Sequence, residues 1–198
     1  MKLSARLGII LAIALGWRGA LFAGPLANPM QDYLDWENEE RDLYVPDMQT
    51  VWKLEVDING DGRKEVLLST PGYGDRQGNL WAVYLPVGGG YMRQKKEIKF
   101  REDYHVIADL DGRSCLLSYM PAKGGGTFHS HRIQKGSITE KEIAHIAHIE
   151  SPKDAGNRLF KKYFENVRAD QKGKFTELSM DALKQQGYRI PVHKAKNK

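Results

Sequence analysis

The sequence predicts a mainly β fold with helical ends, an antiparallel double sheet or sandwich built from two blade-like pseudo-repeats. Three observations lead to this fold class. Between about residues 50 and 150, apolar runs of strand length alternate with turns rich in Gly, Pro and Asp. A pattern centred on Asp-Gly-Arg occurs twice, about 50 residues apart, which lies in the range of β repeats. Segments with helical periodicity flank this region, so we expect helices to pack on the sheets.

The first residues, 1–23, have the pattern of an export signal. Lys2 and Arg6 precede a short apolar run that ends at Trp17, and small residues allow cleavage after Ala23. Because the apolar run is too short for a comfortable membrane span, we expect a periplasmic or extracellular protein with no span after cleavage. Cleavage removes three basic residues and no acid, which lowers the formal net charge from +5 to +2. The remaining charge indicates no nucleic-acid partner.

About 175 residues follow the signal, enough for one domain with a hydrophobic core. We assign residues 24–150 to a β domain with an N-terminal helix. Asn28 and Pro29 predict the start of that helix, with Asn as its cap and Pro at the first helical position. Its inner stripe consists of Met30, Tyr33 and Leu34.

The first pseudo-repeat covers about residues 51–100. Its first strand has alternating apolar side chains, which is typical of a strand with one buried face. These side chains are Trp52, Leu54, Val56 and Ile58. Residues 65–70 and 80–85 predict two core strands, and residues 91–100 predict a Lys-rich strand at a sheet edge.

Between the first two strands, oxygen-bearing side chains occupy positions that suit a hard cation. In order, the predicted ligands are Asp57, Asn59, Asp61, Arg63 through its backbone carbonyl, and Glu65. Gly62 at the sixth position allows the sharp bend that such a loop needs. The twelfth position is Leu68 and the flanking segments are predicted strands, so the loop departs from an EF-hand.

This loop resembles the calcium loop of the FG-GAP/VCBS repeat class, in which such a loop joins two strands of a β blade. The resemblance covers about a dozen residues and implies one bound Ca²⁺ in a β context. A plain hairpin is the alternative, because Asn-Gly and Asp-Gly both favour tight turns with positive φ.

The second pseudo-repeat covers about residues 103–149. Asp111-Gly112-Arg113 matches Asp61-Gly62-Arg63, but the second loop has no counterpart to Asn59 or Glu65. We therefore expect the second loop to bind a cation weakly or not at all. Two units cannot close a propeller, so a sandwich of seven or eight antiparallel strands is the better prediction.

Residues 151–198 predict a C-terminal helical segment and a basic tail. Residues 151–154 combine an N-cap, a Pro and an acid, and an apolar helical face follows. That face comprises Leu159, Phe160, Tyr163, Phe164 and Val167. Ser179 predicts the cap of a short helix that stops at Gly187, and the tail begins at His193.

Two sets of side chains are candidates for chemistry. His129 and His131 share one strand face, so they can begin a zinc site if His105, His145 or His148 provides a third ligand. An ordinary polar strand face is the alternative.

Asp61 and Asp111 come from related halves and can meet as a pair that shares a proton, as in aspartic proteases. The protease signature Asp-Thr/Ser-Gly is absent, and Asp61 is better used as a cation ligand.

The chain has no GxSxG elbow, P-loop, GxGxxG before a helix or paired CxxC, which argues against serine hydrolases, NTPases and dinucleotide enzymes. We expect a secreted, calcium-stabilised β domain that binds an extracellular protein or glycan, with Tyr73 and Tyr91 available for stacking. The alternative is a secreted hydrolase that uses Asp61 with Asp111, or a metal at His129 and His131.

Overall fold

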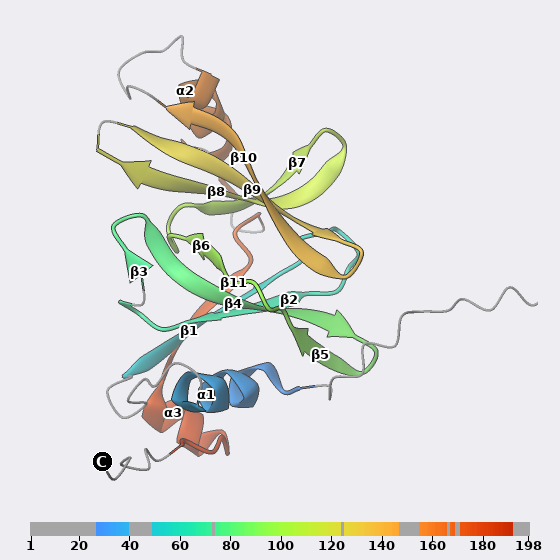
Figure 1. Ribbon diagram of the computed structural model, residues 1–198, viewed down its shortest axis with the longest axis vertical. Helices are drawn as coiled ribbons and strands as arrows, with labels where there is room; N and C mark the ends of the chain where they lie inside the picture. The colour runs from blue at the N-terminus through green and yellow to red at the C-terminus, as the bar shows by residue number, and fades with distance from the viewer. Residues whose placement is uncertain are drawn as a thin grey trace, which may run out of the picture.

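Two antiparallel sheets face each other in the computed structural model, and helices cover the outer side of each sheet (Figure 1). The structure describes residues 27–39, 49–72, 74–123, 125–146, 155–165, 167–168 and 171–191. The two facing sheets and their flanking helices confirm the predicted mainly β sandwich with helical ends. The predicted export signal and the basic tail from His193 lie outside the described residues.

The first sheet contains seven of the described strands, in the order β11-β1-β2-β4-β3, with β5 and β6 also paired to β4. Their bounds are β1 Thr50–Val56, β2 Glu65–Ser69, β3 Gly74–Asp75, β4 Gly78–Val87, β5 Gly90–Arg93, β6 Ile98–Phe100 and β11 Lys174–Ser179. The predicted single strand over residues 91–100 is wrong, because residues 94–97 leave the ladder between β5 and β6.

The second sheet has the order β10-β9-β8-β7, in which each strand pairs with its neighbour along the chain. Its strands are β7 His105–Leu110, β8 Arg113–Ala122, β9 Gly125–Gln134 and β10 Ser137–Ile146. The strands of the first pseudo-repeat therefore lie in one sheet and those of the second in the other. Eleven strands are described, more than the seven or eight expected, because β3, β5 and β6 are short pieces and β11 was not foreseen.

Helices α1 (Pro29–Glu39) and α3 (Met180–Gln185) cover the outer side of the first sheet. Asn28 Oδ1 accepts a hydrogen bond from Met30 N at 3.1 Å, and Ser179 Oγ accepts one from Ala182 N at 3.1 Å. Both predicted N-caps are thus confirmed. Tyr33 and Leu34 of α1 are buried as predicted.

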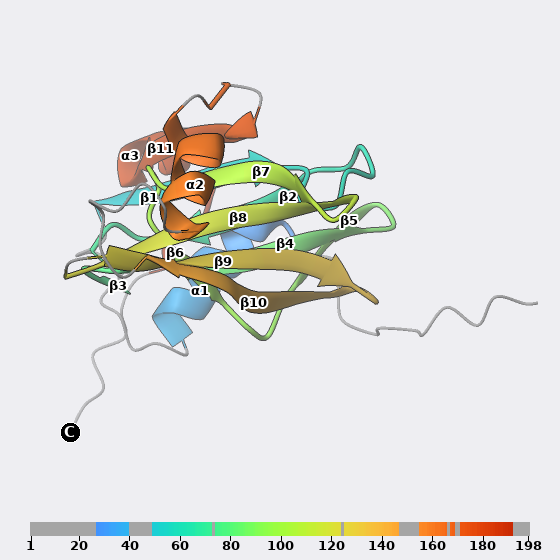
Figure 2. The same cartoon turned by 90° about the horizontal axis from the view of Figure 1, so that it is seen from above.

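The C-terminal region returns to both sheets. Helix α2 (Ala155–Phe160) continues into a π-helical turn, η2 (Lys161–Glu165), and both lie over the second sheet (Figure 2). Their aromatic side chains, Phe160, Tyr163 and Phe164, pack on the outer side of that sheet. The predicted cap at residues 151–154 lies outside the described residues. The prediction that residues 151–198 are helical or tail is wrong at β11, which pairs antiparallel with β1.

The core between the sheets is centred on Trp81, which is fully buried. Its ring stacks on that of Phe100 with centroids 4.8 Å apart, and its Nε1 donates to the Phe100 carbonyl at 3.0 Å. Leu116 and Ile138 of the second sheet pack in the same cluster. Of the described helices, none combines the length and apolar character that a membrane crossing requires.

Candidate functional site

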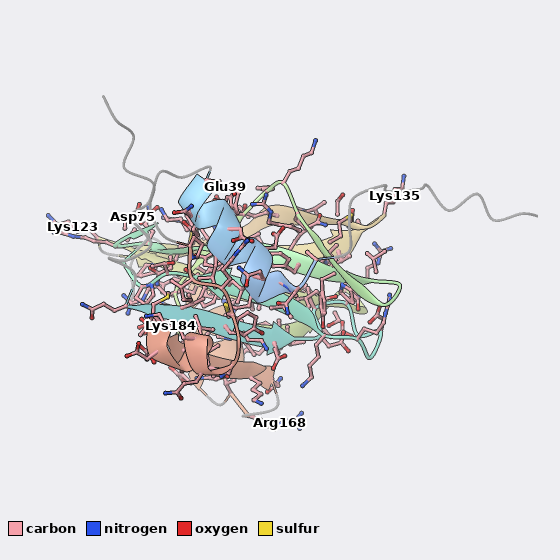
Figure 3. The ribbon with its side chains drawn as sticks, turned by 90° about the horizontal axis from the view of Figure 1, so that it is seen from below. Glu39, Asp75, Lys123, Lys135, Arg168 and Lys184 are labelled. Atoms are coloured by element: carbon pink, nitrogen blue, oxygen red, sulfur yellow. The ribbon has the colours of Figure 1, made fainter. Side chains whose placement is uncertain are left out.

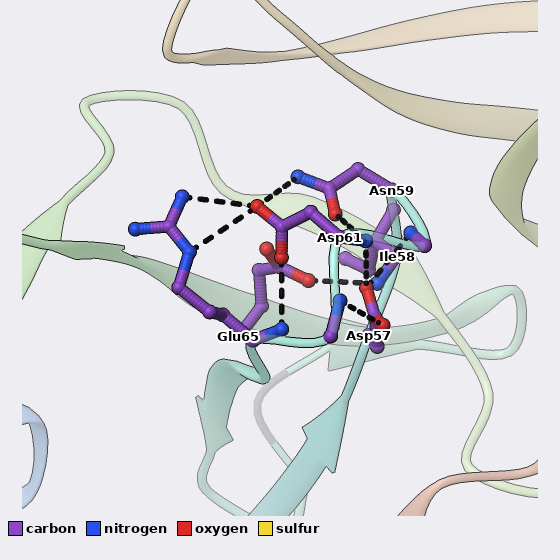
Figure 4. Close-up of polar contacts among 8 residues, drawn as sticks. Asp57, Ile58, Asn59, Asp61 and Glu65 are labelled. Atoms are coloured by element: carbon purple, nitrogen blue, oxygen red, sulfur yellow. Dashed lines mark hydrogen bonds and ion pairs between the residues drawn. The ribbon is translucent and has the colours of Figure 1, made fainter.

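The predicted calcium loop, residues 57–64, connects β1 to β2, and the pairing of Val56 with Glu65 closes it. The loop therefore joins two neighbouring antiparallel strands, as the FG-GAP/VCBS resemblance implies. Figure 4 shows Asp57, Asn59, Asp61 and Glu65 gathered around this bend.

Asp57 organises the backbone of the loop. Its Oδ1 accepts hydrogen bonds from Gly60 N at 2.8 Å and Asp61 N at 3.1 Å, and its Oδ2 accepts one from Gly62 N at 2.9 Å. Gly60 and Gly62 have φ of +74° and +83°, which glycine adopts at little cost. A carboxylate thus lies inside the bend, although this geometry also suits a plain turn.

Asp61 is engaged by its own neighbour in the chain. Its Oδ1 accepts from Arg63 N at 2.8 Å, and its Oδ2 lies 2.9 Å from Arg63 Nη2. The hydrogen bonds from Arg63 hold the pKa of Asp61 below its usual value. Asn59 Nδ2 donates to the same Oδ2 at 3.2 Å. A cation at this loop would have to take that oxygen from Arg63.

Glu65, the first residue of β2, is the buried carboxylate beside the loop, with 1% of its surface exposed. Its Oε2 accepts from Ile58 N at 2.7 Å. Burial raises the pKa of Glu65 to about 7, and repulsion from Asp57 and Asp61 acts in the same direction. A divalent cation near this carboxylate would oppose both effects.

The donor set fits Ca²⁺ in its chemistry, because carboxylate and amide oxygens are the ligands that hard cations prefer. In the arrangement described, however, no three His, Cys, Asp or Glu side chains within the described ranges converge on a metal position. Ligation therefore requires side chains of the loop to turn, above all Asp61 away from Arg63.

The second Asp-Gly sequence has a different geometry. Asp111 and Gly112 have φ of 57° and 72°, and they form a two-residue turn closed by the pairing of Leu110 with Arg113. The two loops are neighbours, since a Cβ built on Gly60 would lie 3.5 Å from Ser114 Cβ. Asp61 nevertheless interacts with Arg63 and Asn59, and no contact between the Asp61 and Asp111 carboxylates occurs among the described residues. The two loops therefore lie close together, but their aspartates, Asp61 and Asp111, do not form the predicted carboxylate pair.

His129 and His131 lie on the inner face of β9, with nearly parallel rings 6.5 Å apart. His131 is fully buried, its Nε2 lies 2.9 Å from Ser118 Oγ, and burial lowers its pKa to about 4. His129 Nδ1 lies 3.0 Å from Glu140 Oε1, and Lys96 Nζ bonds the other oxygen of that carboxylate at 2.9 Å. This buried polar cluster has no surface opening at Ser118 or His131.

The other histidines are held elsewhere. His105 Nε2 lies 2.8 Å from the Lys172 carbonyl oxygen, His145 Nδ1 lies 3.3 Å from Thr127 Oγ1, and His148 is outside the described residues. Sequence reasoning missed Glu140, because only the pairing of β10 with β9 places it opposite His131. A zinc site here stays a prediction without an identified third ligand.

Of the two tyrosines predicted to be available for stacking, the structure describes only Tyr91. Tyr73 lies outside the described residues. Tyr91 is half-buried against the core under α1, and its carbonyl accepts from Ala27 N at 2.9 Å. Part of the Tyr91 side chain therefore packs in the core, and only the rest is available to a ligand.

Comparison with protein-family models, with curated proteins and with solved structures finds no match to this chain. The FG-GAP/VCBS resemblance therefore stays a prediction that depends on the residues of the loop itself.

Proposed function

We propose that this protein is an exported β domain that Ca²⁺ stabilises and that binds a protein or glycan outside the cytoplasm. The observation that carries the proposal is the set of oxygens between β1 and β2, where Asp57, Asn59 and Asp61 surround the bend above the buried Glu65 (Figure 4). Export is inferred from the signal pattern of residues 1–23.

Electrostatics supports a cation at this position. Three carboxylates lie in a short loop, and the repulsion among them contributes to the raised pKa of Glu65. Since the β1–β2 pairing closes the loop, binding there would be coupled to the stability of the first sheet. Calcium is favoured over zinc because the ligands are oxygens and include neither thiolate nor imidazole.

A binding role is better supported than hydrolysis. His131 is fully buried and the His129 side chain is 14% exposed, so a metal held by these two histidines would have little access to a substrate. The Asp61 and Asp111 carboxylates make no contact within the described part of the chain. They therefore cannot share a proton in this arrangement, as the two carboxylates of an aspartic protease do.

Thermal unfolding in EDTA and in millimolar Ca²⁺ tests the proposal. A site filled at a hundredfold excess over Kd stabilises by ~2.7 kcal/mol, or several degrees in Tm for a domain of this size. We expect this increase in the wild type and its loss in Asp57→Asn. Asp111→Asn is the matched control, because it makes the same change at the other Asp-Gly turn, and it should keep the full increase. Equal Tm values with and without Ca²⁺ in the wild type would refute calcium stabilisation.

A further inference from the structure

Among the residues that the structure describes, α2 and η2 cover only part of the outer face of the second sheet. Aromatic side chains of α2 and η2, Phe160 and Phe164 among them, pack against Tyr119 and Phe128. Beside this covered part, toward the β7–β8 and β9–β10 turns, the described residues form a groove of about 570 Å³. Leu110 and Asp111 form one wall, and Leu159 of α2 lies in the groove as well.

Arg132 of β9 provides the guanidinium group in this groove. Its Nη2 donates to the Leu110 carbonyl at 2.8 Å, which holds the side chain in place, while its Nε is shielded from solvent and finds no acceptor. No carboxylate pairs with Arg132 among the described residues. A partly buried cation is normally paired, because desolvation without a counter-charge is costly. Arg132 is thus held by the Leu110 carbonyl and lies against the buried Cys115 thiol, while no carboxylate of the described residues neutralises its charge.

The surrounding charges favour an anion at one side of the groove. Lys141 of β10 lines the groove, is exposed and forms no ion pair with the described residues. Glu140 also borders the groove, but its carboxylate bonds Lys96 and approaches His129 on the opposite face of the sheet. Asp111, at the β7–β8 turn, is the acidic side chain that remains on the wall.

We propose that this groove, with Arg132 and Lys141 as its cations, binds the carboxylate of an acidic sugar such as a uronic acid. The inference rests on the proposed binding function and names its ligand class, but the groove is separate from the calcium loop. The planar guanidinium matches a carboxylate in shape and hydrogen-bonding pattern, and a point charge such as lysine lacks that match.

The form of the groove favours a sugar over a peptide. The β7–β8 turn and α2 border it, and its volume lies in the range of small-ligand sites. Ser130 and Thr139 add hydroxyl groups, and Leu110, Ile143 and Leu159 add aliphatic surface for the faces of sugar rings. A mixture of hydroxyl, aliphatic and cationic groups suits a ring with hydroxyls and one carboxylate.

Trigalacturonate, titrated into the full calcium-loaded protein and followed by NMR of backbone amides and of the Arg132 Nε–H group, tests this proposal. We expect saturable shifts at Arg132 and along β9 and β10, weakening as salt rises. Methyl-esterified trigalacturonate is the matched ligand control, because it keeps the sugar and removes the charge, and it should not bind. Arg132→Gln should weaken binding at least tenfold.

Lys141→Gln is the second variant, chosen because Lys141 is exposed and its replacement should not disturb the fold. It should weaken binding several-fold and leave the amide spectrum of the free protein unchanged. Lys123→Gln removes an equal charge at the opposite end of the second sheet from Lys135 (Figure 3) and should leave affinity as it is. Equal binding of the ester, or no binding by the acid, overturns the inference. Tighter binding of a triglutamate peptide overturns the sugar assignment. If Asp57→Asn abolishes the calcium effect while trigalacturonate fails to bind, the groove inference alone falls.

Discussion

At the scale of single residues, the buried imidazole of His131 links the polar cluster between the sheets to the pH dependence of folding. Its pKa in the folded protein is about 4, below the ordinary value of 6.5, chiefly because burial disfavours the charged ring. Between these two values the unfolded chain binds the extra proton and the folded chain does not. The contribution of His131 is therefore complete above about pH 6.5 and is lost as pH falls toward 4.

His131→Gln keeps a polar side chain but removes this titration. We expect the variant to be less stable than the wild type at pH 7 and the difference to shrink by up to about 3 kcal/mol on going to pH 4. Urea unfolding of both chains at several pH values measures it. Groups without contact to His131 titrate alike in both chains and cancel in the difference, whereas Glu140 does not, because the His131 charge helps to lower its pKa. Ser118→Ala removes the hydrogen-bond partner and keeps the ring, so its stability difference should change little with pH. A constant difference for His131→Gln would contradict the assignment.

The same residues show what a sequence can predict about a site. The two-residue period of a strand correctly placed His129 and His131 on one face. Nothing local indicated that Ser118 and Glu140 lie beside them, because those contacts depend on the register of β8 and β10 against β9. The groove at Arg132 was missed for the same reason.

At the scale of elements, features defined by nearby residues were predicted and those defined by distant partners were not. The caps of α1 and α3 depend on one side chain within three residues of the bonded amide. Strand β11 is mostly exposed and has little apolar pattern of its own. Its extended form depends on pairing with β1, more than 100 residues away in the chain.

The β9–β10 hairpin contains an element-scale weakness that can be corrected. Lys135 and Gly136 form its two-residue turn with φ of 51° and 73°, and Gln134 pairs with Ser137. Such turns prefer Asn-Gly, because Asn tolerates positive φ better than Lys. We expect Lys135→Asn to raise the free energy of unfolding by about 0.5–1 kcal/mol, measured by urea denaturation with an unchanged slope. Lys123→Asn, at a residue without positive φ, should give no gain. Equal effects in both variants would point to lost charge instead of turn geometry.

At the scale of the whole molecule, the two sheets share one core. Trp81 and Phe100 from the first sheet and Leu116 and Ile138 from the second belong to the same buried cluster. The chain also returns to the first sheet through β11 after completing the second. Separation of the sheets would expose this cluster to water. We therefore expect the two sheets to unfold together.

Trp81→Leu tests this cooperativity. Loss of much of the indole from a fully buried position should reduce the free energy of unfolding by about 3 kcal/mol. Hydrogen exchange should show the same reduction at amides of β2 in the first sheet and of β8 in the second, because both depend on the one core. Trp36→Leu is the control, because Trp36 of α1 is only partly buried against the outer side of the first sheet, and it should reduce the free energy of unfolding by less. If β8 kept its protection while β2 lost it, the pseudo-repeats would be separate folding units and the shared core would contribute little to either.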